Sequence, residues 1–245
     1  MKLNIVSPIQ QTWTLMDILD KRPPRGWEKI FQSARPEIED LQEDLEKDEQ
    51  QYGCYYPEKK NLFRAFDLTP LDRVRVIIVG QDPYHNLTKT TREIRAQGLS
   101  FSVSKLSDIP PSLLNIFKEL RSDIPEFVQP SHGDLSSWAL QGVLLLNSCL
   151  TVLPNQPGSH KKIWNGVLYR IIEAIVDINN KAIFVLWGRK AQELKKMIRG
   201  RCPVLEAGHP SSMNAKGGFL GCKHFSQINT LLANVGSQPI DWNLH

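Results

Sequence analysis

Apolar residues along this chain fall into two alternating patterns, which together predict its fold. Short continuous runs rich in Val, Ile and Leu are typical of strands that are buried on both faces. Longer stretches place apolar residues three and four positions apart, which is the spacing of an amphipathic helix. The alternation predicts an α/β protein: a single domain with a central four-stranded, mostly parallel twisted sheet flanked by helices on both faces.

The predicted elements can be placed along the sequence. Strands are expected at 74–79, 143–146, 182–186 and around Val204, and a further strand-like run covers 99–103. Helices are expected at 36–51, 113–120, 135–141, 164–175, 192–199 and 228–232. No internal repeat, low-complexity tract or linker divides the chain, so one domain is the simplest organisation for 245 residues.

The helix expected at 36–51 concentrates negative charge. Eight acidic residues and one lysine give the segment 37–50 a net charge of −7, whereas the whole chain carries +4. Ile38, Leu41 and Leu45 recur at helical spacing beneath the acids, which predicts a solvated surface helix. The remaining residues carry +11. This excess favours a polyanionic partner such as nucleic acid, although charge alone does not identify one.

The cysteine spacing indicates the kind of cellular compartment in which the protein works. All four, Cys54, Cys149, Cys202 and Cys222, lack CxxC or Cys/His ligand spacing, which predicts a reducing compartment and no structural metal. Residues 1–26 lack the apolar core of a signal peptide, and no apolar run reaches membrane-spanning length. We therefore expect an intracellular protein that does not bind membranes. Nuclear, cytoplasmic and nucleoid locations all stay open.

Polar side chains follow three of the predicted strands. Residues 80–85, Gly-Gln-Asp-Pro-Tyr-His, come directly after the first strand, and Asn147 and His209 follow two later ones. Because the carboxyl ends of parallel strands meet at one edge of a sheet, we expect these groups to form a single site. Neither a GxGxxG motif nor a P-loop follows any strand, which disfavours a nucleotide-binding α/β protein.

These motifs closely resemble those of the uracil-DNA glycosylase family. Supporting matches are residues 109–113, 132–138, 186–188, 221–225 and 239–242. The resemblance runs from about Trp27 to Trp242. It implies a catalytic domain over residues 27–245, with residues 1–26 as a poorly ordered N-terminal extension. It also implies a monofunctional DNA repair enzyme that flips uracil out of DNA, hydrolyses the N-glycosidic bond and leaves an abasic site, with no cofactor and no metal.

The chemistry of that reaction suits the strand-end residues. A departing base anion and a sugar cation require a negative group near the sugar and a donor beyond the base. In the family, the residue matching Asp82 activates water and the residue matching His209 donates to uracil O2. Asn147 can accept from uracil N3–H and donate to O4, whereas cytosine would leave these polar groups unpaired.

The resemblance extends to the walls of the pocket. Tyr84 matches the tyrosine that excludes the thymine methyl, and Phe101 matches the ring that stacks on uracil. Gln81 matches a residue beside the base, and His85 one that supports the catalytic turn. The matches to DNA-contacting residues are Ser112, Gly188, Ser211 and Met213.

The chain departs from the family pattern at three places. Arg189 follows Gly188 where a serine is common, and it either adds a phosphate contact or is a solvated residue at the start of a helix. Met213 stands where a leucine wedge is usual, and Ser212 replaces the preceding proline. The wedge is therefore expected to be more flexible and its loop less pre-ordered. Residues 86–97 replace a shorter Gly-Pro-rich stretch beside the catalytic turn. The basic residues in this longer loop either extend the DNA footprint or have no role.

Other functions compete with this interpretation. The fold could serve as a DNA-binding scaffold or replication accessory protein in which catalysis is dispensable. A mismatch-type glycosylase of the wider superfamily is disfavoured by Asp82, Tyr84 and His85. We expect a monomer that acts on single- and double-stranded DNA containing uracil; a protein inhibitor or replication partner stays open.

Overall fold

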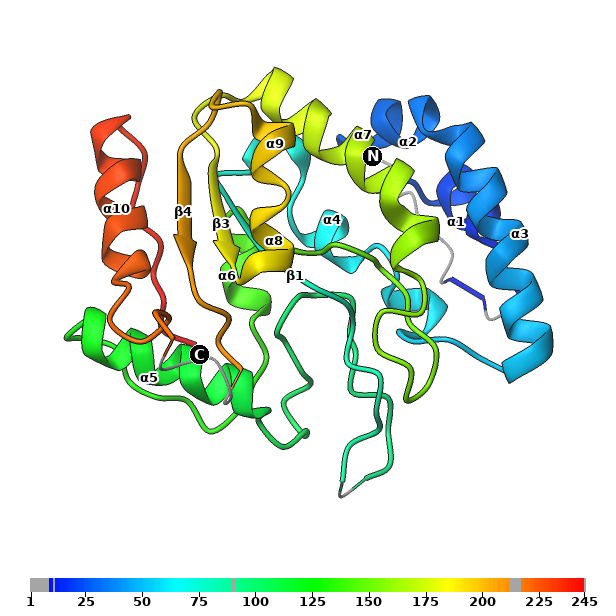
Figure 1. Cartoon of the computed structure of the whole chain (residues 1–245), viewed down its shortest axis with the longest axis horizontal. Helices are drawn as coiled ribbons and strands as arrows, with labels where there is room; N and C mark the ends of the chain where they lie inside the picture. The colour runs from blue at the N-terminus through cyan, green and yellow to red at the C-terminus, as the bar shows by residue number, and fades with distance from the viewer. Residues whose placement is uncertain (1–8, 11, 90, 212–216, 245) are drawn as a thin grey trace, which may run out of the picture.

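A central parallel sheet organises the protein. The computed structural model describes residues 9–10, 12–89, 91–211 and 217–244. Its sheet has the order β2-β1-β3-β4, and every pairing is parallel (Figure 1). The strands are β1 (Val76–Gly80), β2 (Val143–Asn147), β3 (Ile183–Trp187) and β4 (Val204–Ala207). The predicted four-stranded α/β architecture is thus confirmed.

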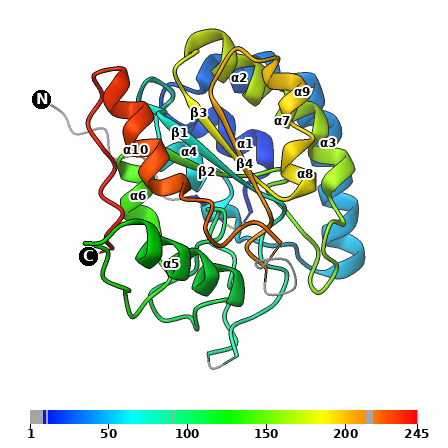
Figure 2. The same cartoon turned by 60° about the vertical axis from the view of Figure 1, so that its left-hand side comes forward.

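Helices cover both faces of the sheet (Figure 2). The longer ones are α3 (Arg35–Tyr52), α5 (Pro111–Asp123), α7 (Lys161–Ile178) and α10 (His224–Asn234). The shorter ones are α1 (Leu15–Lys21), α2 (Glu28–Ser33), α4 (Arg64–Leu68), α6 (Ser136–Leu140), α8 (Arg189–Gln192) and α9 (Lys195–Ile198). Two 3-10 turns lie at Lys59–Asn61 and Leu71–Arg73. Among the helices described, none is long and apolar enough to cross a membrane.

The periodic sequence patterns place the core. Every residue of β1, β2 and β3 is buried, as expected for strands covered on both faces. α7 buries a stripe that includes Trp164, Ile171 and Ile175, and α3 buries Ile38 and Leu41 beneath its acidic face. The amphipathic helices predicted at 36–51 and 164–175 therefore form and pack by the expected faces. The helix predicted at 192–199 is wrong in its bounds, because a turn at 193–194 separates α8 from α9.

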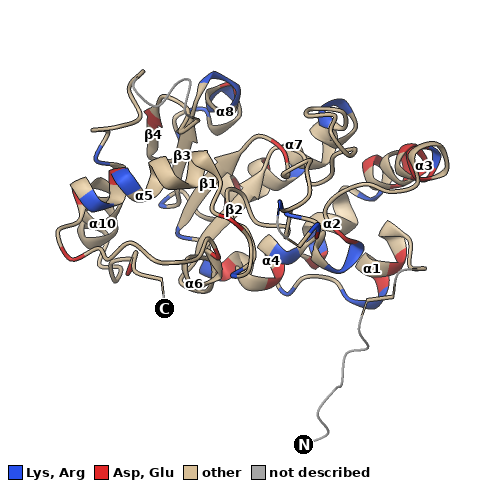
Figure 3. Ribbon diagram, turned by 90° about the horizontal axis from the view of Figure 1, so that it is seen from below, with Lys and Arg blue, Asp and Glu red and all other residues tan. Residues whose placement is uncertain are grey.

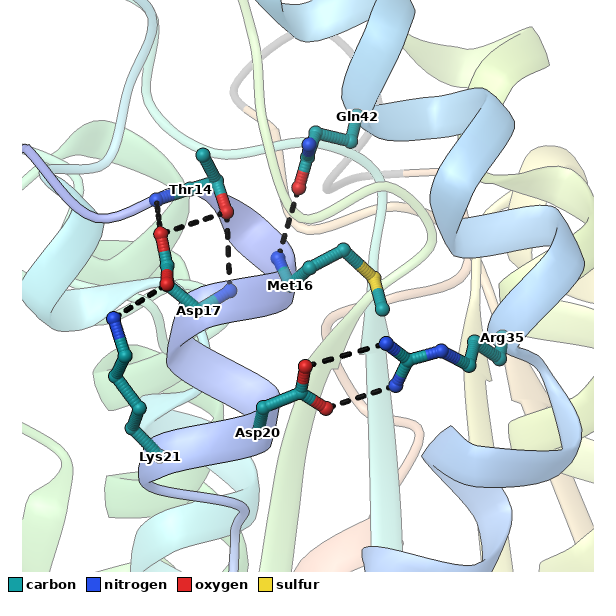
Figure 4. Close-up of polar contacts among 7 residues, drawn as sticks. All are labelled: Thr14, Met16, Asp17, Asp20, Lys21, Arg35 and Gln42. Carbon is teal, nitrogen blue, oxygen red and sulfur yellow. Dashed lines mark hydrogen bonds and ion pairs between the residues drawn. The ribbon is translucent and has the colours of Figure 1, made fainter.

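The N-terminal segment differs from the expectation of a poorly ordered extension. Although residues 1–8 and 11 lie outside the described part, Ile18 is only 1% exposed and joins the main core. Thr14 and Asp17 form a capping box at the start of α1. Asp20 accepts two hydrogen bonds from Arg35 of α3, at 2.8 and 3.2 Å (Figure 4). α1 is therefore a docked part of the fold.

The strand-like run at 99–103 is a turn, which corrects the sequence prediction. Phe101 has a φ of +62°, in the left-handed region that a strand excludes. Ser100 donates its hydroxyl to the Ile78 carbonyl, and the Ser102 hydroxyl accepts a hydrogen bond from the Leu135 amide. The alternating serines thus point into the protein, where side-chain hydrogen bonds take the place of a strand ladder.

Candidate active site

A cavity of about 200 Å³ opens at the carboxyl edge of the sheet. The predicted site residues that line it are Gln81, Asp82, Tyr84, His85, Phe101, Ser112, Asn147 and His209. β1 and β2 are neighbours in register, with Gly80 opposite Asn147, so the turn after β1 and the end of β2 meet. The structure therefore brings together the groups that follow separate strands in the sequence.

Asp82 lies in the turn that follows β1. Its Oδ2 accepts a hydrogen bond from the Gly158 amide at 2.9 Å. Pro83 fixes φ directly after the aspartate and restricts the backbone of Asp82 itself. The carboxylate is thus oriented by the connection between β2 and α7, and its Oδ1 accepts no hydrogen bond from the described residues.

Asn147 is the last residue of β2 and is only 7% exposed. Its side chain depends on the absence of one at Gly80, because a Cβ there would lie 2.3 Å from Asn147 Oδ1. Within the described residues, the carboxamide makes no hydrogen bond to the protein, although it lines the cavity. Since buried amides are normally paired, this group is set up to bind a ligand.

His209 follows β4 and faces the cavity in a defined tautomer. The Ser211 amide donates to its Nδ1 at 3.0 Å, so in the neutral ring the proton lies on Nε2. Burial lowers the pKa of His209 below its usual 6.5, the nearby Lys190 lowers it further, and Asp82 acts in the opposite direction. The site therefore holds a neutral imidazole that can donate from Nε2.

Tyr84 and Phe101 form adjoining walls of the cavity. The Tyr84 hydroxyl donates to the Phe101 carbonyl at 3.2 Å, and burial raises the pKa of the phenol. Phe101 packs against Trp187 and His209, with ring centroids 5.6 and 6.2 Å away. The left-handed backbone of Phe101 costs about 1–2 kcal/mol and is held in place by these contacts.

Gln81 and His85 belong to the same turn and are held by their backbones. The Gln81 carbonyl accepts hydrogen bonds from the Ser148 hydroxyl at 2.5 Å and the Cys149 amide at 3.3 Å. The His85 carbonyl accepts from the Asn155 amide at 2.8 Å. The turn is therefore tied to the single connection between β2 and α7.

The predicted DNA-contacting residues surround the cavity only in part. Ser112 lines it at the start of α5, and Ser211 contacts His209 through its amide. Gly188 adopts a φ of +88°, and a Cβ there would lie 2.9 Å from His209 Cβ. This close approach explains the glycine. Met213 and Ser212 lie outside the described residues.

Sequence reasoning missed a buried network behind Phe101. Gln97 donates to the Ser102 hydroxyl at 2.9 Å and accepts from Arg64 at 2.5 Å. Arg64 also donates to the Ser136 hydroxyl at 2.9 Å. Gly158 was missed as well. None of these residues follows a strand, and only the turn-forming pair Pro157-Gly158 carried a local signal.

Charge is unevenly distributed over the molecule. Acidic residues gather on α3, at the end of the molecule away from α5 and α10, whereas α8 beside His209 carries Arg189 and Lys190 (Figure 3). In the parts of the chain that the structure describes, no group of three or more His, Cys, Asp or Glu side chains is arranged to hold a metal.

Comparison with known proteins identifies relatives of this chain. The model of the uracil DNA glycosylase superfamily matches residues 66–233. The chain is 50% identical to uracil-DNA glycosylase of Yersinia enterocolitica over 189 residues, 76% of this chain and 80% of that protein. The corresponding protein of Francisella tularensis subsp. novicida is 48% identical over 191 residues, which are 77% of this chain and 84% of that one.

Solved structures extend the likeness beyond the catalytic motifs. The crystal structure of mimivirus uracil-DNA glycosylase matches with a TM-score of 0.87 and 26% identity, covering 97% of this chain and 90% of that one. A mimivirus UNG variant in complex with UGI also gives a TM-score of 0.87 at 26% identity, covering 97% and 92%.

The fold and the site define an α/β glycosylase that acts on DNA. The chain belongs to the uracil-DNA glycosylase family, which confirms the resemblance seen in its motifs. It is a monofunctional glycosylase that excises uracil from DNA in base excision repair, a hydrolase of N-glycosyl bonds.

Proposed function

We propose that this chain receives an extruded uracil nucleotide in the cavity beside Asp82, Asn147 and His209. The observation that carries the proposal is the convergence of a carboxylate, an unpaired carboxamide and a neutral imidazole on one cavity of about 200 Å³. A base within a duplex cannot reach such a cavity, so the nucleotide leaves the stack at a cost of a few kcal/mol.

Asp82 acts on the sugar side of the bond. As the bond between C1′ and N1 breaks, its electron pair leaves with the base and positive charge develops on the sugar. The carboxylate stabilises that charge and accepts a proton from the attacking water, whose oxygen bonds to C1′. Because Gly158 occupies Oδ2, Oδ1 is the oxygen available for the water. General-base catalysis of this kind contributes roughly 10²–10⁴ in rate.

His209 acts on the departing base. Its Nε2–H donates to uracil O2, where negative charge develops, while Ser211 holds Nδ1 as an acceptor. A neutral donor stabilises the uracil anion without giving up its proton. Loss of one donor of this kind typically costs on the order of 10²–10³ in rate.

Asn147, Tyr84 and Phe101 select the base. The Asn147 carboxamide pairs with N3–H and O4 of uracil, and cytosine leaves the same atoms unpaired, a mismatch worth about 10⁴ or more in discrimination. Tyr84 closes the space that a thymine methyl would occupy. Phe101 stacks on the ring, and Gln81 and His85 hold the turn on which Asp82 lies.

Ser112, Gly188 and Ser211 hold DNA phosphates around the cavity, and Met213 serves as an apolar wedge that stabilises the flipped state. The start of α5 adds helix amides beside Ser112. The enzyme acts as a monomer on single- and double-stranded DNA. The mimivirus UNG variant in complex with UGI supports a protein inhibitor of this class for the chain as well.

The test is release of free uracil from matched single-stranded and duplex oligonucleotides that contain U, T or C, in the presence of EDTA. We expect release from U alone, and we expect Asp82→Asn to lower the rate by about 10²–10⁴ because it removes the proton acceptor. Equal thermal stability of the two proteins serves as the control for folding.

Two outcomes would contradict the proposal. Release of T or C at rates comparable to that of U would show that Asn147 and Tyr84 do not select the base. Full activity of Asp82→Asn would show that the Asp82 carboxylate is not needed for the reaction.

A further inference from the structure

Residues 86–89 and 91–97, which follow the catalytic turn, form the two arms of a hairpin. Leu87 and Ile94 form an antiparallel bridge. The Thr88 amide donates to the Glu93 carbonyl at 2.8 Å, and the Thr88 hydroxyl accepts from the Glu93 amide at 3.0 Å. The two arms project from the sheet edge that carries the cavity, beyond the neighbouring loops (Figures 1 and 2).

The base of the hairpin is anchored to the body of the protein. Arg95 is only 6% exposed and donates to both carboxylate oxygens of Asp108 at 2.8 Å. Leu87 and Ile94 pack against a small cluster that contains Tyr56 and Val152. An ion pair in which Arg95 Nη2 contacts both Asp108 oxygens, together with an apolar contact, fixes the direction in which the arms point.

The hairpin begins and ends at the cavity. His85 lies directly before it, and Ala96 and Gln97, at its end, also line the cavity. Arg92 is four residues from Ala96, and its left-handed φ of +58° keeps the span below the limit of about 13 Å for fully extended chain. One DNA strand carries a charge for about every 3.4 Å of helix axis, so arms of this length are comparable to the spacing of a few phosphates along one strand.

The outer part of the hairpin carries two cations that face solvent. Lys89 and Arg92 are exposed, and neither forms an ion pair with a carboxylate in the described chain. The third cation, Arg95, is neutralised by Asp108 at the base. The one acid, Glu93, accepts a hydrogen bond from the Thr91 hydroxyl at 3.1 Å. The hairpin thus presents positive charge only at its outer end.

We propose that Lys89 and Arg92 form a phosphate-binding site for the DNA backbone next to the extruded nucleotide. The inference rests on the proposed entry of the nucleotide into the cavity. It extends that function by adding a DNA contact outside the cavity and outside the catalytic turn. A protein partner fits the outer part of the hairpin less well than DNA does, because the apolar residues Leu87 and Ile94 pack at its base and are not offered to a partner.

The test measures kcat/KM for uracil release from a duplex between 50 and 200 mM KCl. In the Lys89→Ala/Arg92→Ala variant, the slope of log(kcat/KM) against log[KCl] should become shallower by up to about 1.8, because each lost phosphate contact contributes about 0.9. The ratio of the parent's kcat/KM to that of the variant should then fall by up to about 12-fold between 50 and 200 mM KCl. The single-turnover rate at saturating enzyme should not change.

Two matched variants complete the design. Lys181→Ala/Lys196→Ala removes the same charge from exposed positions in the turn before β3 and on α9, and should keep the parent slope. Lys89→Arg/Arg92→Lys keeps the charge and should also keep it. An unchanged slope in the hairpin variant, or an equal change in the Lys181/Lys196 variant, would overturn the proposal.

Failure of the proposed function is distinguishable from failure of the hairpin site. A parent enzyme that releases no uracil at saturating DNA contradicts the function. In that case the salt slope of binding to the same duplex, followed by fluorescence anisotropy, still decides whether the hairpin contacts phosphate: a shallower slope in the variant supports the site, and equal slopes reject it.

Discussion

The amide of Ser211 sets both the orientation and the protonation of His209. An imidazolium would carry a proton on Nδ1 and so would point an N–H at the N–H of Ser211. Burial adds to this effect by disfavouring the charged ring, and Lys190 does the same by repulsion. Asp82 opposes both without reversing the direction of the shift.

A pH profile tests this arrangement. Because the pKa of His209 lies below 6.5, the ring is mostly neutral at pH 7, and the midpoint of any acid loss of uracil release caused by this ring should lie below pH 6.5. It should fall only as the ring becomes protonated at lower pH. His209→Gln should be slower by about 10²–10³ and should lose this part of the acid limb. A limb centred above pH 6.5 would refute the assignment.

Among the elements, α5 connects the cavity to the segment that follows His209. Asn115 donates to the Pro210 carbonyl at 2.8 Å. One turn along, Glu119 accepts from the amides of Gly221 and Lys223, and Asp123 accepts from Ser226. These three side chains lie at helical spacing on one face of α5, so the helix fixes both ends of the segment 210–226.

Glu119 is therefore expected to contribute to stability although it is a buried acid. Glu119→Ala leaves two backbone amides without their acceptor and should lower the free energy of unfolding by about 1–3 kcal/mol. Urea unfolding measures the change. Lys118→Ala, at the adjacent exposed position, should stay within about 0.5 kcal/mol. Equal stability of Glu119→Ala and the parent protein would show that water replaces the carboxylate without cost.

Some elements around the site could be predicted from the sequence and others could not. β1 and β2 could be predicted because continuous apolar runs are needed wherever both faces of a strand are covered. The run 99–103 alternates like a strand, but its serines are buried and bonded by side chains, which no pattern of hydropathy distinguishes. Arg64 and Gln97 reach the site only through tertiary packing, so their role has no local signal.

At the scale of the whole molecule, burial of histidines couples stability to pH. Burial lowers the pKa of His209 and His224 below the value of about 6.5 expected for the unfolded chain. Below that pH the unfolded state binds more protons than the folded state, so acid destabilises the fold. His224 shows why directly, because its Nδ1 accepts a hydrogen bond from the Trp187 indole at 3.0 Å.

The free energy of unfolding, measured with urea, should therefore be lower at pH 5.5 than at pH 7.5. The His224→Gln variant should lose less over the same interval, because one of the groups that take up protons on unfolding is gone. A stability that rises toward pH 5.5 in the parent protein would contradict the coupling.

The anchoring of the segment after His209 has a consequence for how this chain can be changed. The Gly208 amide donates to the Gly218 carbonyl at 3.3 Å, so the base of the loop is closed independently of the residues between. Asn115 and Glu119 hold its flanks. The residues at 212–216 can thus be exchanged as a cassette: a library of sequences there would vary how the enzyme engages DNA while the catalytic groups keep their positions.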